Sequence, residues 1–99
     1  MKKTFFLTVA LASASFAGEW TGFISDASCG AANAKATAEA KECAQRCVKG
    51  GAAPVFVTGD KVINIANPAT VKDLVGEKVK VKGTLDKGTL KVESIAKAS

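Results

Sequence analysis

Apolar and polar residues alternate most clearly in the last quarter of the chain, at residues 77–96 (EKVKVKGTLDKGTLKVESIA). Val79 and Val81 fall on one face of this segment, whereas the lysines between them fall on the other. A period of two is typical of a β-strand that is buried on one side only. A tight turn at Lys87-Gly88 divides the segment, so we predict a β-hairpin here.

The register of this hairpin follows from its turn. Leu85 is expected opposite Leu90, and the same register places Lys82 opposite Glu93 on the polar face. Apolar pattern and charge pairing therefore indicate one register. We interpret the row of lysines as a solvated face that discourages pairing between sheet edges, in preference to an anion-binding surface.

Three other segments carry weaker patterns. Residues 19–25 (EWTGFIS) alternate and predict a strand, but both faces carry apolar groups, so the pattern does not fix whether Trp20 faces the core or a binding surface; we expect the core. Residues 54–66 (PVFVTGDKVINIA) predict a second hairpin. Residues 67–76 (NPATVKDLVG) predict a short helix capped by Asn67, because proline suits the first helical position.

Between the first strand and the first hairpin the composition changes. Residues 31–51 (AANAKATAEAKECAQRCVKGG) are rich in good helix formers, and the glycine pair ends the pattern. Asn33 and Thr37 are the alternative caps. The apolar stripe of this helix is weak and consists of Ala36, Ala40, Cys43, Cys47 and Val48. Because such a helix buries little by itself, another contact is needed to hold it in place.

The order of elements is strand, helix, hairpin, short helix, hairpin. This order predicts a mainly β (α+β) fold, a small five-stranded barrel of the OB type. The Ala-rich helix that carries Cys43 and Cys47 is then an insertion between the first and second strands. The alternative is a five-stranded roll or small open sheet packed by the helix.

The start of the chain has the pattern of a secretory signal peptide. A basic MKK precedes an apolar run that is shorter than the ~20 residues of a membrane span. We predict a signal peptide at residues 1–17 with cleavage before Gly18, and cleavage after Ala14 as the alternative. Residues 18–99 then form one small domain, secreted or periplasmic, with no lipid or membrane anchor.

The chain has three cysteines and no histidine. Cys43 and Cys47 lie one helical turn apart, and a regular helix does not bring such a pair to disulfide geometry. A disulfide within the chain must therefore include Cys29, with either Cys43 or Cys47 as its partner. Closing this loop of about 15 to 19 residues contributes on the order of 3 kcal/mol. The remaining thiol is either free or joins two chains in a disulfide-linked dimer.

A metal site is the alternative use of these cysteines. Three thiolates favour Cu(I) or Zn, and zinc takes a fourth ligand, for which Asp26 is the candidate. The spacing of the cysteines lacks the paired C-x-x-C pattern of zinc ribbons.

Other function classes find little support in the sequence. Without histidine there is no Ser-His-Asp or Cys-His pair, the carboxylates are scattered, and we expect no enzymatic activity. The formal charge is +5, of which the two lysines of the signal peptide contribute two. Few aromatic residues accompany the remaining lysines, so we expect no nucleic-acid binding.

Three segments, WTGFISDASCG, CAQRCVKGGAAPVFV and GEKVKVKGTL followed by LKV, resemble a group of small exported bacterial proteins of unknown function. The resemblance implies a secreted β-barrel-like domain and no particular activity. Members of this group often have a histidine before the middle cysteine, where this chain has Ala40. A metal site built from Asp26, the cysteines and that histidine would lack one ligand here. The C-terminal part also resembles exported bacterial OB-fold proteins.

Together these observations predict a small secreted or periplasmic module, stabilised by a disulfide, that binds an unknown ligand or has a structural role. The alternative is a thiolate metal-binding protein that uses Cys29, Cys43 and Cys47.

Overall fold

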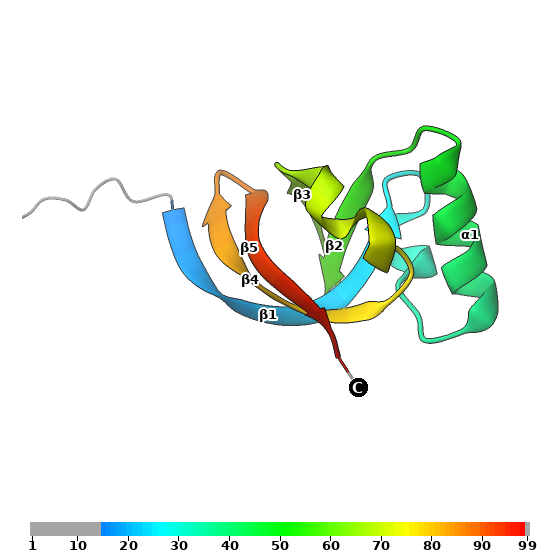
Figure 1. Ribbon diagram of the computed structural model, residues 1–99, viewed down its shortest axis with the longest axis horizontal. Helices are drawn as coiled ribbons and strands as arrows, with labels where there is room; N and C mark the ends of the chain where they lie inside the picture. Colours follow the sequence, from blue (N-terminus) through cyan, green and yellow to red (C-terminus); the bar gives the residue numbers. More distant parts are fainter. Residues whose placement is uncertain (1–14, 99) are drawn as a thin grey trace, which may run out of the picture.

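The computed structural model describes residues 15–98, so most of the predicted signal peptide lies outside the described residues. The described chain forms a closed barrel with the strand order β1-β2-β3-β5-β4 (Figure 1). The strands are β1 (Ser15–Asp26), β2 (Pro54–Thr58), β3 (Lys61–Ile65), β4 (Lys78–Asp86) and β5 (Thr89–Lys97). The helices are α1 (Ala38–Lys49) and two short 3₁₀ segments, η2 (Gly30–Asn33) and η3 (Pro68–Leu74). The prediction of a small OB-like barrel with an inserted helix is confirmed.

Strand β1 is long and curved, and it belongs to both sides of the barrel (Figure 1). It pairs with β4 from Ser15 to Phe23 and with β2 from Phe23 to Asp26. Gly22 stands where the pairing changes, and a Cβ there would collide with the Val57 carbonyl oxygen. Glycine therefore allows β1 to approach β2 closely as it bends.

The β4–β5 hairpin has the predicted turn but not the full predicted register. Leu85 lies opposite Leu90 as expected, but the register shifts between Lys82 and Gly83, and Lys82 lies opposite Ser94. The predicted pairing of Lys82 with Glu93 was therefore wrong. A β-bulge bends and twists a strand more strongly, as closure of a small barrel requires. A register predicted from charge pairing across two strands cannot detect the extra residue of a bulge.

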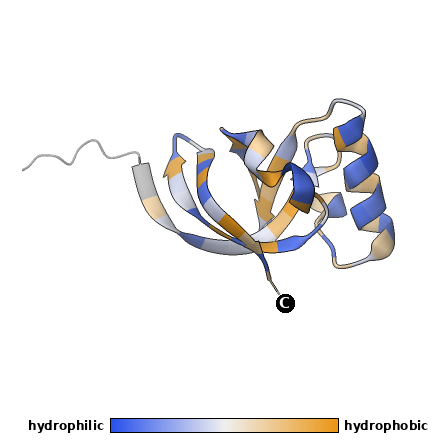
Figure 2. Cartoon of the chain, viewed as in Figure 1, coloured by the Kyte–Doolittle hydropathy of each residue, from blue (hydrophilic) through white to orange (hydrophobic). Residues whose placement is uncertain are grey.

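The barrel interior is apolar, and orange and blue positions alternate along β4 and β5 (Figure 2). Trp20 is half-buried and packs against the core cluster, in the same cross-strand row as Val81. Its expected place on the core side of the sheet is confirmed. The core cluster consists of Ile24, Ala44, Phe56, Val71, Val75, Val79, Val81, Leu90 and Val92.

Helix α1 lies at one end of the barrel, away from the β4–β5 turn (Figure 1). Thr37 is its cap, since the Thr37 hydroxyl accepts a hydrogen bond from the Ala40 amide at 3.2 Å. The helix is shorter than predicted, because residues 30–33 form the separate segment η2. Its buried face also differs: Ala40 and Ala44 are buried, whereas Ala36 is exposed.

The predicted second helix is present as the 3₁₀ segment η3, with Asn67 at its N-cap position as expected, but the Asn67 side chain makes no capping hydrogen bond. Instead, the side-chain NH₂ group of Asn67 donates to the Val92 carbonyl at 2.8 Å, and the side-chain oxygen of Asn67 accepts from the Val92 backbone N–H at 2.9 Å. Strands β3 and β5 pair over only two positions, Asn64 with Thr89 and Ile65 with Leu90. The Asn67 side chain therefore extends this short seam by satisfying the next backbone groups of β5.

Candidate functional site

The three cysteines, which are 14 and 4 positions apart in the sequence, come together where α1 meets the barrel. Cys29 is exposed and directly precedes η2, whereas Cys43 and Cys47 are half-buried on α1. Cys43 is one of the groups that raise the pKa of both Cys29 and Cys47, so the three side chains lie in one neighbourhood. All three are free thiols in the structure. No two of them are joined by a bond, and the disulfide from Cys29 stays a prediction.

Asp26 lies at the end of β1 and is fully buried beside the cysteines. Its carboxylate accepts hydrogen bonds from the Cys29 amide and from the Asn33 side chain, each at 2.9 Å. It also interacts with the Cys47 thiol. Burial raises the pKa of Asp26, but these hydrogen bonds outweigh it and hold the pKa below its ordinary value. Asp26 is thus an ionised group that organises the loop.

The loop that holds Cys29 follows from the local sequence DASCG. A carboxylate that accepts from a backbone amide three residues later is a common way for aspartate to close a turn. Gly30 has a positive φ of 54°, and the buried Ser25 hydroxyl donates to the Gly30 carbonyl at 2.7 Å. Cys29 is therefore fixed by its own backbone before any covalent bond forms.

The thiols of Cys29 and Cys47 are not activated as nucleophiles. Burial raises the pKa of Cys29 and Cys47, the charge of Asp26 raises it further, and Cys43 adds to the effect. The pKa of Cys47 rises to about 11. Since the thiolate is the reactive and metal-binding form, these thiols are mainly protonated near neutral pH.

The described part of the chain shows no arrangement of three or more His, Cys, Asp or Glu side chains that would hold a metal ion. The Asp26 carboxylate oxygens are directed to the Cys29 amide and Asn33. The arrangement thus differs from the predicted thiolate site, in which Asp26 would be the fourth ligand.

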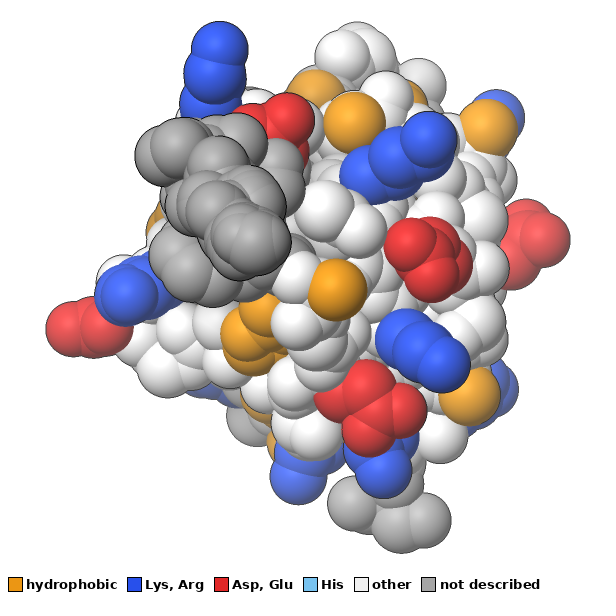
Figure 3. Space-filling view, turned by 90° about the vertical axis from the view of Figure 1, so that its left-hand side faces the viewer, with side chains coloured by type: hydrophobic (Ala, Val, Ile, Leu, Met, Phe, Trp, Pro, Cys, Tyr) orange, Lys and Arg blue, Asp and Glu red, His pale blue; other side chains and the backbone are white. Residues whose placement is uncertain are grey.

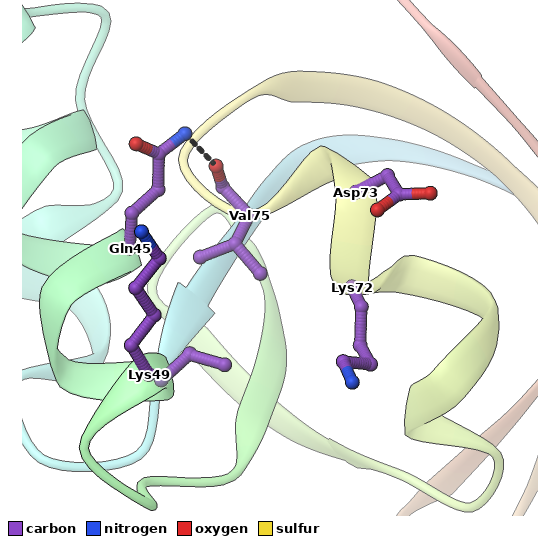
Figure 4. Close-up of a pocket in the computed structure, with 6 residues that line it drawn as sticks. Gln45, Lys49, Lys72, Asp73 and Val75 are labelled. Carbon is purple, nitrogen blue, oxygen red and sulfur yellow. Dashed lines mark hydrogen bonds between the residues drawn. The ribbon is translucent and has the colours of Figure 1, made fainter.

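A groove of about 590 Å³ lies on another flank of α1, between this helix and η3 (Figure 4). Lys49 lines it on the side of α1, and Lys72 lines it on the side of η3. The Gln45 amide donates to the Val75 carbonyl at 3.2 Å and joins the two walls. The residues that line the groove are Gln45, Val48, Lys49, Lys72, Asp73 and Val75. Sequence reasoning missed it, because its walls come from two segments more than 20 residues apart.

The lysines of β4 remain a solvated surface. Lys78, Lys80 and Lys82 are exposed, and Lys82 pairs across the strands with Glu19. On the face shown in Figure 3, basic and acidic side chains are mixed and neither sign gathers in one patch. Glu77 binds Lys41 of α1 at 2.7 Å, and this hydrogen bond is the main cause of its lowered pKa.

Comparison of the chain with models of protein families, with curated proteins and with solved structures found no match. Within residues 15–98, no helix is long and apolar enough to cross a membrane. The fold and the site together define a small OB-like barrel with a helical insertion between β1 and β2. A cluster of three cysteines and one aspartate lies where the insertion meets the barrel.

Proposed function

We propose that this protein is an exported module, secreted or periplasmic, in which a disulfide from Cys29 fastens α1 to the barrel. Its role is binding or structural rather than catalytic. The sequence pattern of residues 1–17 supports export, and an exported chain reaches an oxidising compartment where disulfides persist. A single domain of this size has a thin core and benefits from such a bond.

The convergence of Cys29 with the cysteines of α1 is the observation that carries this proposal. The only buried residues of α1 are Ala40 and Ala44, whose small side chains remove little apolar surface from water. Noncovalent attachment of α1 also relies on single contacts, such as the Lys41–Glu77 ion pair and the Gln45–Val75 hydrogen bond. A disulfide would restrict the unfolded chain and hold α1 where these contacts are sparse.

The competing hypothesis is a Cu(I) or Zn site at the same cysteines. Two features of the described residues weigh against it: the Asp26 oxygens already accept two hydrogen bonds, and the Cys47 thiol has a raised pKa. Metal binding requires deprotonated thiols, so it would have to overcome both features.

Intact-mass spectrometry of the full chain expressed with its leader tests the proposal, with and without reductant and N-ethylmaleimide. We expect one modifiable thiol per chain in denaturant, and three after reduction. Three modifiable thiols in exported material would contradict the disulfide. A covalent dimer would contradict a bond within the chain. Elemental analysis of protein purified under reducing conditions would support the competing hypothesis if it found stoichiometric Cu or Zn.

The groove beside α1 is the proposed ligand surface of this module. Lys49 and Lys72 reach it from separate elements, and Val48 and Val75 supply apolar lining. Asp73 also lines the groove, so two lysines stand against one carboxylate, and the remaining positive charge favours a ligand with an acidic group. Succinate is a suitable probe: it should shift the backbone amide resonances of the groove residues more than those of Lys87 and Lys91 on the opposite hairpin. Equal shifts at the groove residues and at Lys87 and Lys91 would show that the groove does not bind succinate specifically.

A further inference from the structure

We propose that the ligand of the groove beside α1 is an extended acidic peptide segment of a partner protein, held by two grooves that form one seam. This inference rests on the proposed function, because it names the class of ligand for the groove already described, here called the first groove. It goes beyond that function by adding a second groove and by setting a length and a pattern for the ligand.

The second groove has a volume of about 350 Å³ and lies at the other end of α1. Its walls come from the N-terminal end of α1 and from residues 76–78, which directly follow the wall of the first groove. The half-buried Phe23 of β1 and three alanines supply its apolar lining, and Lys41 and Lys78 supply positive charge. The two grooves therefore have the same construction, in which two lysines flank an apolar surface.

Contacts between α1 and the segment that leads into β4 connect the two grooves. Lys41 binds Glu77 at 2.7 Å, and Gln45 donates to the Val75 carbonyl at 3.2 Å. Between them α1 packs closely on Gly76, where a Cβ would lie 2.6 Å from the Lys41 Cγ atom. Because these contacts join α1 to residues 75–77, the two grooves are the two ends of one seam.

The spacing of the grooves sets the length of the ligand. Lys41 and Lys49 line different grooves and are eight positions apart on α1, which corresponds to about 12 Å at 1.5 Å per residue. In an extended chain, side chains four positions apart are separated by about 13 Å and point to the same side. Two apolar side chains at the first and fifth positions of an extended peptide therefore match the two apolar linings.

The charges along the seam select acidic residues between these two anchors. Four lysines and two carboxylates line the grooves: Lys41, Lys49, Lys72, Lys78, Asp73 and Glu77. Glu77 is already bound to Lys41 and lies 3.8 Å from Lys97, and Asp73 is directed away from α1 (Figure 4). The remaining positive charge therefore favours carboxylates in the middle of the peptide.

Fluorescence anisotropy with the exported full chain tests this inference. The probe is a five-residue peptide with leucine at its first and fifth positions and three glutamates between them, with a dye at its N-terminus and an amide at its C-terminus. We expect it to bind at least tenfold more tightly than a probe without the second leucine, because the truncated probe reaches only one groove. Equal affinity would overturn the two-groove seam. A single-stranded oligothymidylate that bound as tightly as the peptide would overturn the assignment to a peptide.

Variants of single lysines examine each groove separately. Lys72→Gln, in the first groove, and Lys78→Gln, in the second, should each weaken binding of the five-residue probe about two- to fivefold. Lys80→Gln is the matched control, because Lys80 is the next exposed lysine of β4 and lines another part of the surface, beside Glu19. An effect of Lys80→Gln as large as that of Lys78→Gln would contradict the second groove.

The outcomes distinguish this inference from the proposed function. If succinate shifts the resonances of the first groove but the second leucine adds no affinity, the seam is wrong and the proposed ligand surface stands. If neither succinate nor the peptide binds, both the seam and the ligand surface are wrong. The disulfide of the module is tested separately by intact mass, and neither result changes it.

Discussion

Replacing Asn67 with alanine tests how the barrel closes where strand pairing is shortest. Only two residue pairs join β3 to β5, and the Asn67 side chain supplies the next two hydrogen bonds, both to the backbone of Val92. Alanine removes both hydrogen-bonding groups of the Asn67 side chain. The part-buried backbone N–H and carbonyl of Val92 are then left without partners. At about 1 kcal/mol for each hydrogen bond, we expect a loss of about 2 kcal/mol in the free energy of unfolding.

The loss should appear in urea unfolding monitored by the fluorescence of Trp20, the single tryptophan. For a domain of this size, it corresponds to a Tm lower by about 8–16 °C. Asn64→Ala is the matched control, because Asn64 is an exposed residue of β3, and we expect it to change stability by less than about 0.5 kcal/mol. If Asn67→Ala were as stable as Asn64→Ala, Asn67 would not close the seam. Measurements under reducing conditions separate this effect from that of any disulfide.

Four further predictions concern the cysteine loop and β1. Cys29→Ser should lower the Tm of the oxidised protein by roughly 12–24 °C through loss of loop closure, with little effect in reductant; equal melting of both oxidised proteins would refute the bond. Asp26 has a folded-state pKa below its unfolded value of 3.8, so the stability it contributes is present above pH 3.8 and lost as the pH falls through the folded-state pKa. Acid titration of Asp26→Asn, followed by circular dichroism, should therefore show a weaker loss below pH 3.8, and an unchanged acid transition would exclude this role. Gly22→Ala should destabilise the barrel by about 1–3 kcal/mol because its methyl group meets the Val57 carbonyl, and urea unfolding equal to that of the wild type would show that β1 does not approach β2 so closely. A chain that begins at Gly18 should melt below one that begins at Ser15, because residues 15–17 of β1 pair with β4; identical Tm values would mean that these three pairs add nothing.

Local patterns in the sequence determine most of the fold. Alternation in residues 77–96, the glycine turns and the change to an Ala-rich segment predicted the hairpins, the inserted helix and their order correctly. These features depend on neighbours two to four positions apart, which set the exposed and buried faces of a strand or helix. The same local chemistry explains the Asp26–Cys29 turn, since its donor and acceptor are three residues apart.

Only the tertiary structure decided how these elements meet. The register shift between Lys82 and Gly83 accompanies closure of the barrel. The Asn67 side chain binds β5 instead of the first turn of η3, because β3 leaves backbone groups of β5 unpaired there. Likewise, the approach of the Cys29 loop to α1 depends on how this helix rests on the barrel. Such contacts join residues far apart in the chain, and their geometry is set by packing of the whole domain, which no short stretch of sequence encodes.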